Sequence, residues 1–260
     1  MSRKITYRSK HLGKTAKTDH SLGVVERPPR IPIDPAVQRY YLEGKRIVIN
    51  KPLHWTSFDV VRKLRNLLQI KKIGHAGTLD PLATGVLIVC TGNSTKEINS
   101  YMAQEKEYTG SFTLGAITDT YDLESEPGTF RDYSFVHEQL LNDTVKQFTG
   151  EIKQLPPAHS AVKKDGIASY ELARKGIAVI REPRMVVINS FEITRLALPL
   201  VYFKVVCETG TYIRSLANDF GEALGCGAYL SSLCRTRIGP FTIEDALAME
   251  EFETSLRKDS

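Results

Sequence analysis

The sequence predicts an α+β protein whose mixed, largely antiparallel sheet is flanked by helices. Segments with the period of an amphipathic helix and segments with strand alternation share the chain. They do not follow the strict strand–helix–strand order that would favour a parallel sheet. A chain of 260 residues can also bury roughly 70–75% of its unfolded surface. It therefore needs neither a metal nor a disulfide to fold.

Strands are expected over residues 46–50, 85–89, 107–115, 184–198, 201–208 and 229–238, and helices over residues 57–69, 95–103, 134–148, 170–176, 211–224 and 243–252. Ser57 is a plausible N-cap for the first of these helices. Pro199 separates two strands that are expected to pair, and Gly176 is expected to end a short helix. The polar stretch TDTYDLESEPG, residues 118–128, is expected to be a loop.

Positive charge is concentrated at the start of the chain. The formal net charge is +5, and residues 1–30 contribute +6, so residues 31–260 are nearly neutral. Such a segment is typical of a solvated arm, of non-specific attraction to phosphate, or of a transit peptide, although it lacks a sustained apolar face. We expect residues 1–34 to form a basic extension ending in the Pro-rich linker RPPRIPIDP, and residues 35–260 to form the folded domain.

The cysteines indicate a reducing compartment. Cys90, Cys207, Cys226 and Cys234 form no CxxC pair, which argues against a zinc site and for reduced thiols. No apolar run approaches the length of a membrane span, and no signal-peptide core follows Met1. We expect a cytoplasmic protein that does not contact a membrane.

The most informative stretch is KKIGHAGTLDPLATGVLIV, residues 71–89. Its glycines permit positive φ and a close approach of a ligand to the backbone. Pro81 holds Asp80 out of the helical region, and the following apolar run has the β-branched content of a buried strand. The pattern predicts an exposed carboxylate on a loop that is anchored by a rigid strand.

Arg214 gives an independent indication of an anionic site. The apolar positions that follow it predict a helix starting near Thr211, so Arg214 lies in the first turn. A cation at that end opposes the helix macrodipole by about 0.3–1 kcal/mol. We therefore expect Arg214 to have an anionic partner.

Several motifs together resemble the TruB family of tRNA pseudouridine synthases. The resemblance extends over nearly all of residues 46–241 and rests first on GHAGTLDPLATGVL, residues 74–87. It continues through INKP, residues 49–52, EKEY, residues 105–108, the segment from LPPAHSAVK, residues 155–163, to YELAR, residues 170–174, then GTYIR, residues 210–214, and GCGAYLSSL, residues 225–233. His159 departs from the family pattern, which has Tyr at that position.

The resemblance implies the pseudouridine synthase fold and isomerisation of the uridine at position 55 in the tRNA T-loop. It implies that Asp80 is the nucleophile and that Arg214 pairs with it and keeps it ionised. Whether the carboxylate attacks the ribose or the base, or acts as a base in a glycal route, is left open. A single carboxylate is also unlike the acid and nucleophile pair of an ordinary glycosidase.

The resemblance assigns further residues to substrate binding. Tyr108 would stack on the extruded uracil, a contact worth roughly 1–3 kcal/mol. Tyr212, on the side of its helix opposite Ile213, would flank the base and could transfer a proton. Leu233 would form an apolar wall of the pocket. His75, next to glycine in a loop, would lie against the flipped nucleotide.

The reaction rearranges one nucleotide, so no cofactor and no metal are implied. The implied partner is the T-arm of tRNA, with no obligatory protein partner, and we expect a monomer. Candidate phosphate contacts are Lys51, Lys71, Lys72, Lys163 and Lys164. Many relatives carry a C-terminal PUA domain, which this chain is expected to lack, and the basic extension is a candidate for replacing its RNA contacts.

Two other functions remain open from the sequence. One is a related synthase acting on another RNA, for instance through an RNA guide. The other is an RNA chaperone that folds tRNA without catalysis, which the set Asp80, Tyr108, Tyr212 and Arg214 disfavours, since a pure binder would not need an ionised carboxylate facing phosphates.

Overall fold

The structure is a computed structural model that describes residues 33–158, 163–164, 167–168 and 181–258. These residues belong to one of the two units into which the chain divides, Pro32–Ser260. The expected helix over residues 170–176 lies outside the described residues, as does His159.

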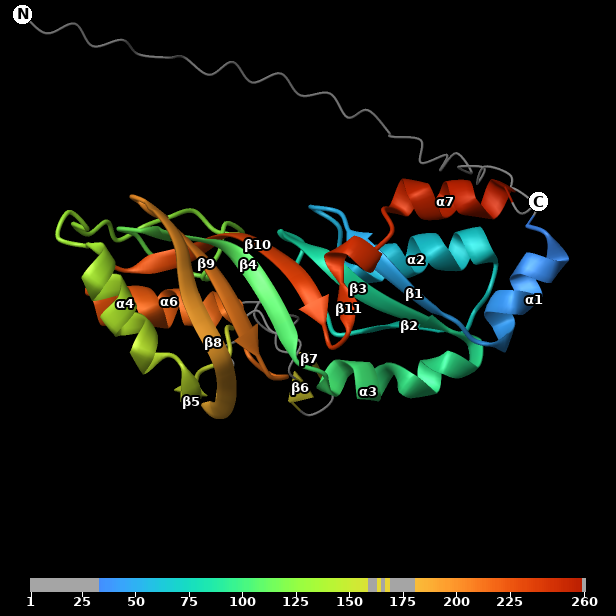
Figure 1. The fold of residues 1–260 in the computed structure, drawn as a ribbon, viewed down its shortest axis with the longest axis horizontal. Helices are drawn as coiled ribbons and strands as arrows, with labels where there is room; N and C mark the ends of the chain where they lie inside the picture. Colours follow the sequence, from blue (N-terminus) through green and yellow to red (C-terminus); the bar gives the residue numbers. More distant parts are fainter. Residues whose placement is uncertain (1–32, 159–162, 165–166, 169–180, 259–260) are drawn as a thin grey trace, which may run out of the picture. The chain divides into compact units, whose positions relative to one another are not determined.

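A mixed sheet is the centre of the described part (Figure 1). Its strands run in the order β1–β3–β10–β4–β9–β8–β5, with β2 paired to β3 and β11 to β10. Their bounds are β1 (Arg46–Lys51), β2 (Ile73–Ala76), β3 (Ala83–Thr91), β4 (Lys106–Leu114), β5 (Gly150–Gln154), β8 (Arg184–Ala197), β9 (Leu200–Cys207), β10 (Ala228–Ile238) and β11 (Phe241–Thr242). Of the pairs between these strands, β3–β10 is parallel and the others are antiparallel. The predicted fold class is confirmed.

A separate pair of short strands, β6 (Lys163–Lys164) and β7 (Ile167–Ala168), lies outside the large sheet. The described helices are α1 (Pro35–Glu43), α2 (Ser57–Leu68), α3 (Ile98–Ala103), α4 (Glu138–Gln147), α6 (Ile213–Leu224) and α7 (Met249–Lys258). Two 3-10 turns, η1 (Gly92–Glu97) and η2 (Ile243–Asp245), precede α3 and α7. The sequence reading placed an unbroken helix over residues 95–103 and began the next one at residue 134, and both predictions were wrong at the N-terminal end.

The first helix, α1, was not predicted from the sequence. Asp34 caps α1, its carboxylate accepting a hydrogen bond from the Ala36 N–H at 2.7 Å, and Pro35 is the first helical residue. Proline is well tolerated there, because the N–H that it lacks would have no partner within the helix. The Asp-Pro pair is therefore a helix start, although the sequence analysis includes it in the Pro-rich linker RPPRIPIDP.

Helices cover the two halves of the sheet separately. Helices α4 and α6 pack against each other, α4 against β8 and α6 against β10 (Figure 1). The apolar cluster between them includes Phe112, Phe203 and Phe220. A second cluster lies between α2, α7 and strands β1 and β3, with Leu64, Leu87 and Phe252 fully or almost fully buried.

The two halves meet where β3 pairs with β10. Ala83, Thr84 and Gly85 are in register with Leu233, Cys234 and Arg235. Gly85 has a φ of 103°, and a Cβ at this position would lie 2.2 Å from the Arg235 carbonyl oxygen. Glycine is therefore required for the two strands to approach, and this junction fixes the loop that carries Asp80 immediately before β3.

Candidate active site

Asp80 and Arg214 form an ion pair across the two halves of the sheet. Arg214 Nε lies 2.8 Å from Asp80 Oδ2, and Arg214 Nη2 donates to Asp80 Oδ1 at 3.2 Å. The Arg214 side chain is 5% exposed and that of Asp80 is 37% exposed. The guanidinium is thus held inside the protein while part of the carboxylate faces solvent. The expected anionic partner of Arg214 is present, and this two-point contact fixes the carboxylate plane.

A second carboxylate, that of Asp122, lies beside the same guanidinium. Asp122 Oδ2 is 3.6 Å from Arg214 Nε, and Asp122 is 3% exposed. Its Oδ1 accepts hydrogen bonds from the Thr120 hydroxyl at 2.6 Å and the Glu124 N–H at 2.9 Å. The sequence reading assigned this stretch to a polar loop and missed Asp122. The position of Arg214 in the first turn of a helix indicated an anionic partner, but no signal in the sequence pointed to a second carboxylate.

Lys51 was one of five candidates for a contact to RNA phosphate, and its burial contradicts this candidate. Its side chain is fully buried. The ammonium donates to the carbonyl oxygens of Pro52 at 2.9 Å, Trp55 at 2.5 Å and Pro81 at 3.4 Å. Burial lowers the pKa of Lys51 to about 8, against the opposing attraction of Asp80. Lys51 therefore ties the turn after β1 to the residue that follows Asp80.

Arg235 supports the Asp80 loop from the other side. It is 1% exposed, and its Nε and Nη2 donate to the carbonyls of Val86 at 2.8 Å and Gly77 at 3.2 Å. These carbonyls flank the Asp80 loop, so Arg235 fixes both ends of it. The sequence reading assigned Arg235 no role.

Tyr108 lies on β4, directly opposite Arg235 on β10. It is 8% exposed and belongs to the same core cluster as Leu79 and Ala83, the residues on either side of the Asp80 loop. Burial raises the pKa of the Tyr108 hydroxyl, with the Arg235 cation acting in the opposite direction. The phenol is thus kept neutral and is packed under the loop.

His75 and Tyr212 are placed differently from the sequence expectation. His75 lies on strand β2, paired with Val89, and not in a loop. Burial lowers its pKa, and the nearby Arg235 lowers it further. Tyr212 is the N-cap residue of α6, with extended backbone, and so precedes the helix. Gln154 holds its backbone, accepting from the Tyr212 N–H at 2.8 Å and donating to its carbonyl at 3.1 Å.

A cavity of about 170 Å³ opens at Asp80. Asp122 and Leu233 also line it, together with Leu53, His54 and Leu123 among others. Leu233 contributes an apolar side chain to the lining. Tyr108, Tyr212 and His75 are not among the described residues that line the cavity, so the structure does not bring these three side chains to Asp80 as it brings Arg214 and Leu233.

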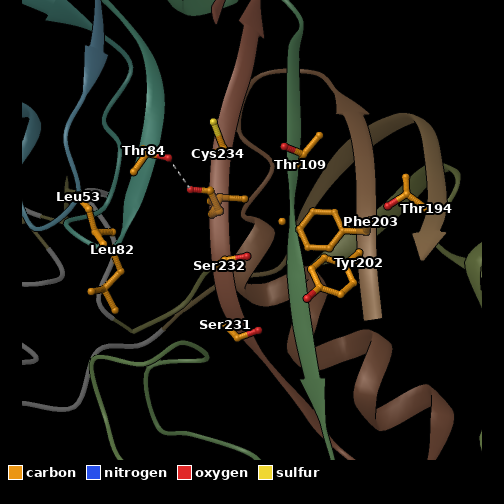
Figure 2. A pocket seen from close by; sticks show the side chains of 12 residues that line it. Leu53, Leu82, Thr84, Thr109, Thr194, Tyr202, Phe203, Ser231, Ser232 and Cys234 are labelled. Carbon is orange, nitrogen blue, oxygen red and sulfur yellow. Dashed lines mark hydrogen bonds between the residues drawn. The ribbon is translucent and has the colours of Figure 1, made fainter. Parts of the chain in front are cut away.

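A second, larger hollow of about 480 Å³ adjoins the first and shares Leu53, Leu82, Ser231, Ser232 and Leu233 with it. Figure 2 shows its other side chains, Thr109, Thr194 and Tyr202 among them, projecting from neighbouring strands. Thr84 donates to the Leu233 carbonyl at 3.4 Å. Hydroxyl groups and the aromatic rings of Tyr202 and Phe203 thus continue the surface that begins at Asp80.

The remaining candidate phosphate contacts are only partly described. Lys71 and Lys72 are exposed before β2, so they are free to meet a ligand. The side chains of Lys163 and Lys164 lie outside the described residues. Within the described ranges, no group of three or more His, Cys, Asp or Glu side chains is arranged to hold a metal ion. In those ranges no helix is long and apolar enough to cross a membrane.

Comparison with known proteins gives a consistent result. Residues 65–213 match the family described as TruB family pseudouridylate synthase (N terminal domain), and residues 214–260 match the tRNA pseudouridylate synthase B C-terminal domain. The chain is 52% identical over 224 residues to tRNA pseudouridine synthase B of Flavobacterium johnsoniae, covering 84% of this chain and 98% of that protein. The protein of the same name from Bacteroides fragilis is 47% identical over 218 residues, covering 82% and 94%.

Among solved structures, the crystal structure of a Cbf5-Nop10-Gar1 complex contains a similar chain, with a TM-score of 0.66 and 32% identity. The similarity covers 84% of this chain and 56% of that one. The family match includes the Asp80 loop, Tyr108 and Tyr212, and the second match begins at Arg214. On these sequence and structural similarities, the chain belongs to the TruB family of pseudouridine synthases.

Proposed function

We propose that this pseudouridine synthase isomerises the uridine at position 55 in the T-loop of tRNA, with Asp80 as the reacting carboxylate. Conversion of uridine to pseudouridine in tRNA follows from its family. The proposal adds the position, the T-arm as the bound element, and the role of each side chain. One observation carries it: the partly exposed carboxylate of Asp80, held at two points by the buried Arg214, at the opening of a small cavity.

The chemistry needs what this arrangement supplies. The bond from ribose C1′ to N1 of uracil breaks, the base turns, and a bond from C1′ to C5 forms, while the C5 proton leaves and N1 gains one. No atom or electron pair enters from outside. An ionised carboxylate is required whether it attacks the ribose or the base or removes a ribose proton. The Arg214 contact holds Asp80 in a fixed orientation for any of these steps.

The cavity at Asp80 is suited to a single planar base. Leu233 gives it an apolar wall, which excludes water that would release the loosened uracil. In the proposal, Tyr108 forms the floor on which the base stacks, Tyr212 flanks the base beside Arg214, and His75 meets the displaced nucleotide from β2. Flipping the nucleotide costs a few kcal/mol, which contacts to the RNA must offset.

The proposal also retains the expected organisation. Residues 35–260 would form the catalytic domain and residues 1–34 a basic extension. The enzyme would act as a monomer in the cytoplasm, on the T-arm, without an obligatory protein partner.

The test is to incubate the purified protein with unmodified tRNA and to map pseudouridine by carbodiimide adducts and primer extension. The expected result is modification at position 55 and no modification in a transcript with cytidine at that position. Pseudouridine at another site, or activity that appears only after a guide RNA or a second protein is added, would overturn the assignment. Binding of tRNA without any modification would favour the chaperone.

A further inference from the structure

The turn between β1 and α2 contains a residue in an unusual conformation. His54 has a φ of 66°, in the left-handed region that glycine adopts freely and other residues rarely do. Strained residues of this kind persist where the surroundings hold them, and they cluster at ligand sites. Glycine would be less strained at this position, so the presence of a histidine side chain requires an explanation.

The surroundings do hold it. The His54 N–H donates to the Pro81 carbonyl at 2.8 Å, and Pro81 directly follows Asp80. The buried ammonium of Lys51 donates to carbonyls on both sides of His54, those of Pro52 and Trp55. The turn and the Asp80 loop thus form one hydrogen-bonded unit, and the position of His54 is fixed relative to the carboxylate.

His54 lines the cavity at Asp80 and is exposed. Its neighbours at the opening, Leu53 and Leu123, are 48% and 49% exposed and apolar. The acidic side chains of the cavity are Asp80 and Asp122. Among the described residues that line it, His54 alone can carry a positive charge.

The charges explain why a donor is needed there. Both carboxylates line the cavity, whereas the cations near them, Arg214 and Lys51, are buried and do not line it. A nucleotide that enters the cavity brings its phosphate towards these carboxylates, and the exposed leucines offer the phosphate no hydrogen bond. An imidazole at the opening supplies a donor, and it adds a positive charge when protonated.

We propose that His54 binds the RNA directly, donating a hydrogen bond to a backbone phosphate that flanks the flipped uridine. The inference rests on the proposed function and adds a substrate-binding residue to it. It also accounts for the strain: the left-handed backbone presents the imidazole at the opening, and glycine, which would relieve the strain, would lose the contact.

Two variants distinguish the contribution of the His54 side chain from that of its backbone conformation. His54→Gly keeps the N–H that bonds Pro81 and suits the positive φ, so the protein should fold with an unchanged or higher melting temperature. His54→Asn also tolerates this φ and retains a donor of shorter reach. Gln69→Gly is the matched control, because Gln69 has a φ of 52° at the C-cap of α2 and does not line the cavity.

The measurement is tritium release from a T-arm RNA, giving kcat and KM. Loss of a hydrogen bond to a charged group predicts that His54→Gly raises KM about 10-fold to 100-fold, with kcat within about 3-fold. His54→Asn should recover part of the difference, and Gln69→Gly should match the wild type. Two further substrates, each with one neutral methylphosphonate on one side of the uridine, identify the phosphate. For one of these two substrates, the wild type should have a higher KM than with the unmodified RNA. The KM of His54→Gly for that substrate should equal its KM for the unmodified RNA.

Three results would overturn the proposal. One is an unchanged KM in the folded His54→Gly protein. Another is a fall in kcat with KM unchanged, which would assign His54 to the chemical step. The third is that, at both positions, the methylphosphonate raises KM by the same factor in the wild type and in His54→Gly. Failure of the proposed function is distinct, since the wild type would then form no pseudouridine in the T-arm.

Discussion

Replacing Arg214 with Gln removes the charge on which the two carboxylates of the site depend. Arg214 is 5% exposed and contacts Asp80 at 2.8 Å and Asp122 at 3.6 Å. Removing one partner of a buried ion pair costs about 3–5 kcal/mol, because the remaining charge stays buried. Asp80, 37% exposed, can regain water, whereas the Asp122 side chain is 5% exposed and cannot. Most of the destabilisation should therefore come from Asp122.

A double-mutant cycle of Arg214→Gln and Asp122→Asn measures how much of the destabilisation comes from Asp122. We expect Arg214→Gln to lower the free energy of unfolding by about 3–5 kcal/mol. Adding Asp122→Asn should recover at least about 1 kcal/mol, since the buried charge is then gone. Activity should fall at least about 100-fold in Arg214→Gln and should not recover in the double variant, because the orientation of Asp80 is lost in both.

Urea unfolding followed by tryptophan fluorescence gives the free energies, and tritium release from labelled tRNA gives the activity. The reasoning fails if the two substitutions are additive in stability. It also fails if Arg214→Gln retains activity within about 10-fold of the wild type, given the 100-fold loss expected for a displaced reacting group.

Three further predictions concern Gly85 and Leu233 of the site and the buried Lys106 at the start of β4. Gly85→Ala should destabilise the protein by at least about 3 kcal/mol in urea unfolding, because its Cβ would meet the Arg235 carbonyl at 2.2 Å. Gly150 also has a positive φ, 93°, but a Cβ there would meet no atom within 4 Å, so Gly150→Ala should lose only the contribution of the strained backbone. Leu233→Ala should lower kcat/KM roughly 10-fold by removing part of the apolar wall, with the unfolding midpoint reporting any loss of folding. Between pH 8 and 9 the free energy of unfolding should rise less steeply with pH in Lys106→Met than in the wild type. Burial lowers the pKa of Lys106 from 10.5 to about 8, so the folded protein releases a proton that the unfolded chain keeps, worth up to about 1.4 kcal/mol per pH unit. Equal slopes would contradict this assignment.

The sequence anticipates the features that depend on local pattern. Residues 184–198 and 201–208 alternate in polarity on either side of Pro199, and they form the pair β8 and β9. Local pattern also predicts an exposed Asp80 and an anionic partner for Arg214, and the resemblance to the TruB family implied that these two residues pair with each other. Neighbouring residues in the chain carry the information for the strands and for the exposure of Asp80.

Burial of charge could not be anticipated in this way. The Lys51 ammonium contacts the carbonyl of Pro81, 30 positions away, and Asp122 lies beside the guanidinium of Arg214, which comes from a distant helix. The same holds for Arg235, whose partners are 149 and 158 positions away. A positive φ at His54 is likewise fixed by the bond to Pro81 and has no signal in composition. The roles of Tyr108, Tyr212, His75 and Leu233 stay predictions until variants are assayed.

The central claim is that the carboxylate of Asp80 performs the reaction, and Asp80→Asn tests it most directly, since the amide keeps the size of the side chain and removes its charge. The measurement is single-turnover tritium release from uridine-labelled tRNA, with binding of the same RNA followed by filter retention. The account predicts that the variant binds the RNA with an affinity near that of the wild type and forms no detectable pseudouridine. Turnover by Asp80→Asn at a rate near that of the wild type would contradict the account.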